Sequence, residues 1–362
     1  MIQTNHTVVL VIVCFGVSVI NLATAQPTKS DQPSVFPAAQ WERKTPMDVG
    51  LSQQAVQEFE AIVGGRGCIV CDGYMVHTWG EFDQPHDVAS AVKPFYSYLL
   101  MKAIEEKKLF NTEQRVVSFW PELQNKIPAS HADRMLTLRH LAFQTACLGY
   151  QESPGQAFDY NDATMGFFWD TLINRIYKVP WDQAEEKVIQ PLLGQPLGFQ
   201  DGTPRVNGSK PGRFAVSTRD FCRFGWMMLN EGKWQDQQVL SAKFARQLVS
   251  EPLPLKLPRT TAEPSETYFP VRSIGGGGNQ CFHNGGYSWL WWLNHPCEDG
   301  TRWFPDVDPG LFACFGHGGQ EGMAVLPGSR VIVSWVGKEL HQDRERGNRA
   351  FRLLQPGKTG RP

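Results

Sequence analysis

The spacing of apolar residues along the chain predicts a helix, a pair of strands, a long helical stretch, further strands and a last helix. Near the start, apolar residues at helical spacing follow Ser52, a residue type that caps helices, and predict a helix to about Val63. Two short apolar runs, 68–71 and 74–77, then flank Asp72-Gly73. An Asp-Gly pair between apolar runs is a strong signal for a β-hairpin, so both runs are predicted strands.

The pattern is mostly helical between about 111 and 264 and returns to strands after that. Predicted helices in this central stretch cover 137–142, 161–177, 181–193, 217–229 and 241–249. Predicted strands beyond it cover 287–293, 322–326 and 331–336, and a last helix covers 346–354. This order predicts one α/β domain, formed by 41–110 and 265–356, with a helical part, 111–264, inserted between its two segments.

The size and charge of the chain fit a globular enzyme and argue against some partners. With 362 residues, the chain can form one large domain or two closely packed ones. Its net charge is −1, its pI is about 6.8, and it contains no basic block. These values argue against nucleic acids and anionic membrane surfaces as partners.

Residues 1–25 have the pattern of a secretory signal peptide. The apolar run 8–20 is too short to span a membrane comfortably, and Ala23-Thr24-Ala25 after it is a small-x-small cleavage site. We expect cleavage after Ala25, a tether over 26–40, and a short tail over 357–362. The sequence thus predicts a secreted or periplasmic protein with no stable membrane span.

Seven cysteines remain after the expected cleavage, and an exported compartment permits disulfides. The odd number means that at least one thiol is free or pairs outside the chain. Cys281 and Cys297 bracket one aromatic segment and are the expected disulfide. Cys68 and Cys71 have the spacing of a redox or zinc pair. However, residues three apart in a strand face opposite sides, which argues against both uses.

Ser90-Ala-Val-Lys93 is the stretch that carries candidate chemistry. If Ser90 opens the helix predicted from there to about Lys107, Lys93 lies one turn further on the same face. A serine hydroxyl becomes a good nucleophile only when a base removes its proton, and a lysine can be that base only when it is neutral. The motif is short, and about one copy is expected by chance. A capped surface helix with an exposed lysine is the alternative interpretation.

Further segments occur in the order and spacing of a known family. They are 136–145, Phe158-Asp-Tyr160-Asn-Asp162, 196–199, 217–225 and His317-Gly-Gly319. Together with the Ser90 motif, they make the chain resemble the serine β-lactamase and penicillin-binding-protein superfamily over about 41–355. The match is best to the class C and esterase-type branch. The resemblance implies an α/β (α+β) fold, with an antiparallel sheet flanked by helices and an inserted all-helical domain.

The resemblance also implies roles for individual residues. Ser90 would be the acylating nucleophile, and Lys93 and Tyr160 would share the base and acid work around it. The backbone N–H groups of Ser90 and Gln320 would form the oxyanion hole. The residues that would bind the substrate are Asp162, His317, Gly318 and Gly319. No His/Cys/Asp cluster has the spacing of metal ligands, so neither a metal nor another cofactor is expected.

Gln144-Thr-Ala-Cys147 departs from the His-Thr-Ser-Gly type turn of the family, and two further departures matter for the chemistry. Asp162 stands where asparagine is usual, and an ionised carboxylate near Lys93 would keep the lysine protonated and weaken it as a base. His317 stands where β-lactam-active members have a lysine that holds the substrate carboxylate, and a histidine is largely neutral at pH 7. Lys358-Thr-Gly360 spells the lysine motif outright, but it lies in the tail with no strand after it.

These observations favour a secreted serine hydrolase that acts through an acyl-enzyme on a small-molecule ester or amide substrate. One alternative is a β-lactamase or D-Ala-D-Ala carboxypeptidase, which would take a peptide-like substrate. The other is a catalytically inactive binding protein that kept the fold and lost the chemistry.

Overall fold

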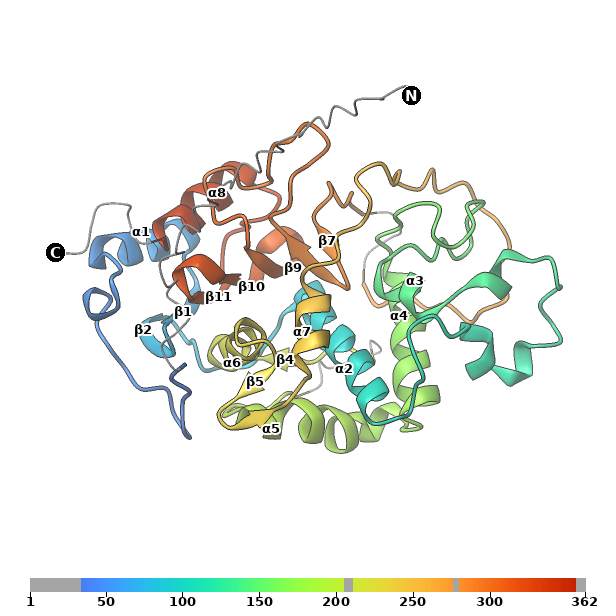
Figure 1. Ribbon diagram of the computed structural model, residues 1–362, viewed down its shortest axis with the longest axis horizontal. Coiled ribbons are helices and arrows are strands. Elements are labelled where there is room, and N and C mark those ends of the chain that lie inside the picture. Colours follow the sequence, from blue (N-terminus) through green and yellow to red (C-terminus); the bar gives the residue numbers. More distant parts are fainter. Residues whose placement is uncertain (1–33, 205–210, 276–279, 356–362) are drawn as a thin grey trace, which may run out of the picture. The chain divides into compact units, whose positions relative to one another are not determined.

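A seven-stranded antiparallel sheet lies at the centre of the fold (Figure 1). The structure, a computed structural model, describes residues 34–204, 211–275 and 280–355. The strand order is β2-β1-β11-β10-β9-β8-β7, so strands from the two ends of the chain lie side by side. The strands are β1 (Arg66–Cys71), β2 (Tyr74–Trp79), β7 (Tyr287–Ser288), β8 (Trp291–Leu293), β9 (Phe312–Gly316), β10 (Glu321–Leu326) and β11 (Val331–Val336).

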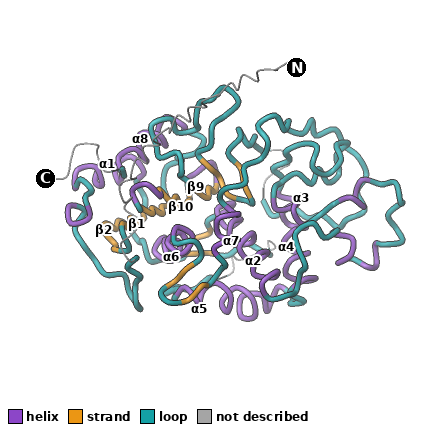
Figure 2. Tube along the Cα trace, in the orientation of Figure 1, coloured by secondary structure: helices purple, strands orange, loops and turns teal. Residues whose placement is uncertain are grey.

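Helices and loops make up most of the chain between β2 and β7 (Figure 2). The α-helices are α1 (Gln53–Val63), α2 (Lys93–Glu105), α3 (Leu138–Ala142), α4 (Asp162–Asp170), α5 (Gln195–Leu197), α6 (Thr218–Leu229), α7 (Ala242–Leu248) and α8 (Arg344–Leu353). Two π-helical segments are η7 (Thr171–Ile176) and η9 (Glu185–Gly194). The short 3₁₀ turns are η2 (Met47–Val49), η3 (Ala89–Val92), η4 (Val116–Phe119), η5 (Pro121–Leu123), η6 (Ala132–Met135), η8 (Trp181–Gln183), η10 (His317–Gly319) and η11 (Pro327–Ser329). Two-residue strands pair as β3 (His86–Asp87) with β4 (Ala215–Val216) and as β5 (Lys233–Trp234) with β6 (Gln237–Gln238).

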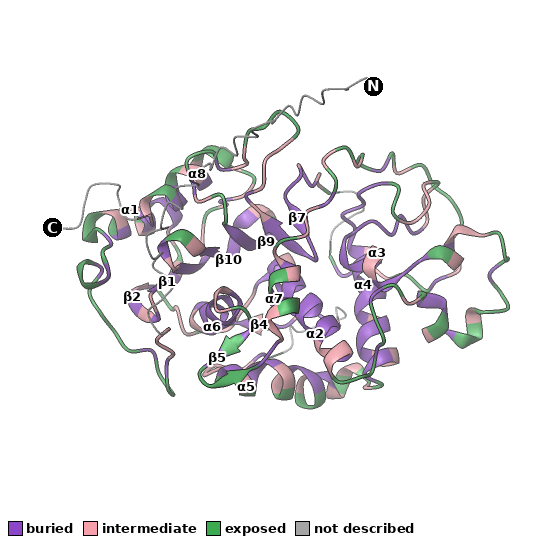
Figure 3. Cartoon of the chain, in the orientation of Figure 1, coloured by how far each residue is buried: buried purple, intermediate pink, exposed green. Residues whose placement is uncertain are grey.

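Helices cover both faces of the sheet. Successive side chains of a strand point to opposite sides, so each face presents side chains against which a helix can pack. On one face, Trp335 of β11 packs edge-on against Phe351 of α8, with ring centres 5.7 Å apart. On the other face, Ile332 of the same strand lies against Gly225 of α6. A Cβ atom at Gly225 would be 2.9 Å from Ile332 Cγ2, so glycine is what lets α6 approach this closely. The strands and α6 are accordingly largely buried (Figure 3).

Local sequence signals predicted many of these elements. The side chain of Ser52 accepts a hydrogen bond from the N–H of Ala55 and caps α1, as expected. The hairpin of β1 and β2 turns at Asp72-Gly73, where both residues have the positive φ that such a turn requires. The predicted mixture of helices and an antiparallel sheet is confirmed. The division at 110 and 264 stays a prediction.

Two expectations differ from the structure. Strand β9 was not predicted, and the expected disulfide between Cys281 and Cys297 is wrong, because both thiols are free. Cys281 lies in the wall of a pocket described below, whereas Cys297 lies in a turn closed by its N–H bond to the Thr301 carbonyl. Cys68 and Cys71 do have different surroundings, since Cys68 Sγ lies 3.5 Å from Cys222 Sγ in α6.

The predicted signal peptide, the tether before residue 34, and the Lys358-Thr-Gly360 motif lie outside the described residues. Within the described part, no helix is both long enough and apolar enough to cross a membrane.

Candidate active site

Ser90 lies in the 3₁₀ turn η3, which leads directly into α2, rather than in the α-helix itself. Ala89 before it has a φ of 49°, in the left-handed region that residues other than glycine seldom adopt. The N–H of Ala89 donates to Asp87 Oδ1 at 2.9 Å. Pro94 suits the first turn of α2, because its missing N–H would have no helical partner there. Backbone strain of this kind is common at functional sites, and here it sets the turn that presents Ser90.

Lys93 lies behind Ser90 and binds both the serine and Asp162. Its Nζ donates to Ser90 Oγ at 3.0 Å and to Asp162 Oδ1 at 3.2 Å. The Lys93 side chain is only 1% exposed, and Nζ lies 3.8 Å from the centre of the Tyr160 ring. Asn161, between the tyrosine and the aspartate, instead caps α4 by accepting from the N–H of Ala163 at 2.8 Å. The start of α4 therefore delivers Tyr160 and Asp162 to the Ser90 turn.

The charges around Lys93 favour its protonated form. Burial alone would lower the pKa of the Lys93 ammonium, but Tyr160 and Asp162 outweigh burial and hold that pKa above its usual value. Burial raises the pKa of the Tyr160 hydroxyl, and the charge of Lys93 offsets this only in part. At neutral pH the resting site therefore holds a lysine ammonium paired with the Asp162 carboxylate, beside an un-ionised tyrosine.

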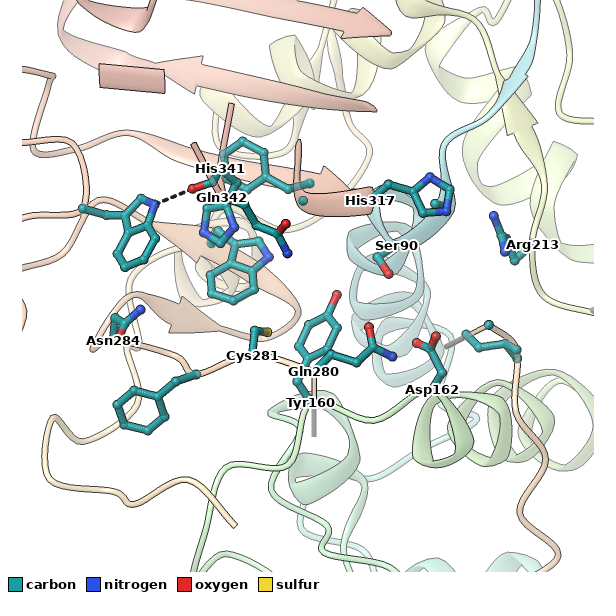
Figure 4. Close-up of a pocket in the computed structure, with 18 of the residues that line it drawn as sticks. Ser90, Tyr160, Asp162, Arg213, Gln280, Cys281, Asn284, His317, His341 and Gln342 are labelled. Atoms are coloured by element: carbon teal, nitrogen blue, oxygen red, sulfur yellow. Dashed lines mark hydrogen bonds between the residues drawn. The ribbon is translucent and has the colours of Figure 1, made fainter. Parts of the chain in front are cut away.

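Ser90 opens into a pocket of about 430 Å³ (Figure 4). Figure 4 shows Ser90 and the hydroxyl of Tyr160 in its middle, with Arg213 towards one end and Asn284 towards the other. The pocket is lined by Ala89, Ser90, Tyr160, Asp162, Trp169, Arg213, Ile274, Gly275, Gln280, Cys281, Phe282, Asn284, Trp292, Trp303, Phe315, His317, Gly318, His341 and Gln342. A volume in this range suits a ligand much larger than an acetyl group.

Most of the site residues expected from the sequence meet in this pocket. Those in its lining are Ser90, Tyr160, Asp162, His317 and Gly318. Lys93, Gly319 and Gln320 are not part of the lining. Lys93 is connected to the pocket through its hydrogen bond to Ser90. The Gly319 carbonyl accepts from Trp335 Nε1 at 2.9 Å, and the Gln320 N–H donates to the His317 carbonyl at 3.4 Å. The Gln320 N–H, which was the second expected oxyanion donor, is thus hydrogen-bonded within its own turn, η10, in this structure.

His317 is more than half exposed and has a carboxylate directly behind it. Its Nδ1 lies 3.0 Å from Glu321 Oε2, and the Glu321 side chain is only 8% exposed. His86 Nε2 lies 3.7 Å from the other Glu321 oxygen. Any positive charge on His317 is therefore offset by Glu321, unlike the lysine charge that the family pattern places at this position.

Several pocket residues were not expected from the sequence. Arg213 forms a two-pronged ion pair with Asp87, with Nε 3.1 Å from Oδ1, and borders the Asp162 end of the pocket. At the other end, aromatic side chains form the wall, namely Phe282, Trp292, Trp303, Phe315 and His341. The aromatic content of 287–293 was a signal for Trp292, but nothing local marked Arg213 or His341.

Among residues 34–204, 211–275 and 280–355, no three His, Cys, Asp or Glu side chains are grouped so that they could hold a metal ion.

Comparisons with known proteins identify the fold and the family of the chain. The family model described as Beta-lactamase matches residues 52–355. Similar solved structures include a penicillin-binding protein homologue from Caulobacter crescentus (TM-score 0.57, 15% identity, covering 84% of this chain and 97% of that one). They also include simvastatin synthase from Aspergillus terreus, LovD9 mutant (TM-score 0.54, 14% identity, covering 85% of this chain and 97% of that one). The hydrolase EstCE1 is similar as well (TM-score 0.53, 14% identity, covering 86% of this chain and 97% of that one). At such identities these structures show the fold alone, and no curated protein matches the chain. The family model covers most of the chain, which therefore belongs to the Beta-lactamase family of serine hydrolases.

Proposed function

We propose that this protein is a serine hydrolase that cleaves an ester or amide through an acyl-enzyme on Ser90. One observation carries the proposal: Lys93 Nζ lies 3.0 Å from Ser90 Oγ at the floor of a pocket that also holds Tyr160. A nucleophile within hydrogen-bond reach of a base, with a third group orienting that base, is the usual arrangement for covalent catalysis. The capped-surface-helix interpretation does not fit, because Lys93 is buried.

In the proposed reaction, Ser90 Oγ attacks the substrate carbonyl and its proton passes to the Lys93–Tyr160 pair. The same pair then returns a proton to the leaving group, and water releases the acyl group in a second, equivalent step. In the resting protein at neutral pH, Lys93 and Tyr160 are both protonated, because the pKa values of both groups are raised. Neither group can then accept the serine proton. We therefore expect activity to rise with pH above neutrality, as one proton leaves the pair.

The Ser90 N–H is the oxyanion donor in this proposal. The Gln320 N–H could join it only after breaking its 3.4 Å bond to His317, which is long and therefore weak. The rearrangement would be confined to η10, where Gly318 already has a φ of 70°.

We propose short esters rather than β-lactams as the substrate class. A β-lactam presents a carboxylate close to the scissile carbonyl, and a charged hydrogen bond to such a group is worth about 1.5–3 kcal/mol. His317 supplies less, because Glu321 lies behind it.

The decisive experiment is labelling with a fluorophosphonate probe, followed by mass mapping of the modified residue. Labelling at Ser90 that Ser90→Ala abolishes supports the proposal. Ser97 is the matched control, because it lies buried in α2, the helix that follows the Ser90 turn, and donates to the Pro94 carbonyl, so Ser97→Ala should keep the label. Labelling at another residue would refute the assignment of Ser90.

The ion pair of Asp162 with Lys93 favours one alternative, a binding protein that kept the fold without the chemistry. A lysine held protonated by a buried carboxylate is a poor base. No labelling of Ser90 at any pH up to about 10, where a tyrosine ordinarily ionises, would support this alternative.

We also propose that the chain is exported, on the basis of its signal-peptide pattern. Expression of the chain with Ala23 and Ala25 changed to Gln should block cleavage. The uncleaved precursor would then be visible by mass. A mature N-terminus at Gln26 in the unchanged chain would support the proposal, and an intact N-terminus would refute it.

A further inference from the structure

The end of the pocket away from Arg213 is built almost entirely from aromatic rings. Trp292 begins this wall, with its ring centre 5.9 Å from that of Tyr160. His341 follows at 4.4 Å from Trp292 and stacks on Phe315 at 4.6 Å with only 19° between the ring planes. Trp303 lies 5.3 Å from His341. A continuous aromatic wall thus runs from the proposed catalytic tyrosine to the far end of the pocket.

Hydrogen bonds and packing hold the wall in place. Trp303 Nε1 donates to the His341 carbonyl at 2.9 Å, and the His341 N–H donates to the Gly318 carbonyl at 3.1 Å. Burial lowers the pKa of His341 to about 3, so its ring is uncharged at neutral pH and stacks as a flat neutral surface. Rings fixed in this way lose little freedom when a ligand binds, which favours affinity.

A small side chamber adjoins this end of the pocket. Its volume is about 20 Å³, and it shares Asn284, Trp292, Trp303, Phe315 and His341 with the main pocket. That space holds about one water-sized group. A group that lies along the wall can therefore place only a small substituent in this chamber.

We infer that this wall, made of Trp292, Trp303, Phe315 and His341, is a subsite for an aryl group of the substrate. The inference rests on the proposed function for the position of the scissile bond. Flat rings pack against aromatic side chains in stacked or edge-to-face geometry, and each such contact improves affinity by about two- to tenfold beyond simple burial. A saturated ring of similar size gains only the burial, so the subsite discriminates phenyl from cyclohexyl.

The test measures binding and needs no turnover. Calorimetry with the Ser90→Ala variant compares 3-phenylpropan-1-ol, which mimics the alcohol side of an ester, with 3-phenylpropanamide, which mimics the acyl side. Each is paired with its cyclohexyl counterpart. We expect one phenyl ligand to bind at least about threefold more tightly than its cyclohexyl partner. The ligand that shows this preference tells which side of the ester occupies the wall.

Variants locate the preference within the molecule. Trp303→Leu and, separately, Phe315→Leu should remove the phenyl preference, while Trp181→Leu is the matched control because Trp181 lies outside this pocket. The ratio of phenyl to cyclohexyl affinity is the readout, since a general loosening of the fold weakens both ligands. Equal binding of the two rings, no binding of either, or a preference that survives both wall variants would overturn the inference.

The result is independent of catalysis. A phenyl preference in a protein that fluorophosphonate does not label would support the subsite and refute the hydrolase. Ser90 labelling without any phenyl preference would support the hydrolase and refute the subsite.

Discussion

The buried carboxylate of Asp159 offers a quantitative test of the loop that carries Tyr160. Asp159 is fully buried, and neither of its oxygens accepts a hydrogen bond from a described residue. Burial raises its pKa from 3.8 to about 7, while the nearby Asn161 side chain opposes the shift only in part. The folded protein therefore keeps Asp159 protonated at pH values where the unfolded chain has already ionised it.

The sign and size of the effect follow from these two values. Below about pH 4 the carboxyl is protonated in both states and costs nothing. Between about pH 4 and 7 the unfolded state is increasingly favoured, by 1.36 kcal/mol per pH unit. The free energy of unfolding should thus fall by about 4 kcal/mol across this window and level off above it. Asp159→Asn removes the ionisation, so the variant should be more stable than the parent by up to about 4 kcal/mol at pH 8.

Urea unfolding at pH 4.5 and at pH 8, followed by far-UV circular dichroism, measures the difference. Parent and Asp159→Asn should differ far less at pH 4.5 than at pH 8. The exposed Asp236→Asn is the matched control and should follow the parent at both pH values. If Asp159→Asn loses as much stability between these pH values as the parent does, Asp159 is not the buried ionising group described here.

The remaining predictions concern the site. Ser90→Ala should abolish p-nitrophenyl acetate hydrolysis with an unchanged circular dichroism spectrum, and near-normal turnover would contradict the nucleophile assignment. Lys93→Ala should lower kcat by about 10² or more, and full activity would leave Tyr160 as the sole base. Asp162→Asn should move the rising limb of the pH–rate profile to lower pH, since it removes one charge that holds the Lys93 pKa up. An unchanged profile would show that Lys93 is not the titrating base. Nitrocefin hydrolysis should be very slow at neutral pH, because His317, with Glu321 behind it, holds a substrate carboxylate only weakly. Turnover comparable with the ester would refute the substrate class. His317→Lys should gain β-lactam acylation, and no gain would assign the block to Asp162 or to pocket shape.

Contacts between residues close in sequence were predictable. The approach of Lys93 to Ser90 needs only one helical turn, and the caps at Ser52 and Ser217 depend on three-residue spacing. The Asp72-Gly73 hairpin is equally local. In each case, one or two residues fix the geometry without help from the rest of the chain.

Contacts across the chain were predictable only through the family pattern, or not at all. Tyr160 and Asp162 reach Lys93 across more than 60 residues, and the expectation for them came from the ordered motifs. His341 enters the pocket because its backbone bonds to Gly318, a contact with no local signature. Strand β9 was missed although β10 is buried just as fully, because β10 and β11 flank the Pro327-Gly-Ser turn, which marks them as a hairpin, whereas no such turn marks β9.

The packing of turn η3 against β9 and β10 has a consequence for the order in which the chain forms its pocket. Turn η3, which presents Ser90, packs against β9 and β10, more than 200 residues further along the chain. A growing chain therefore carries Ser90 long before it can make the surface that holds its turn. A fragment that stops before β9 would leave strand edges unpaired and would lack Phe315, His317 and Gly318, so the pocket should be complete only once nearly all of the sheet has been synthesised.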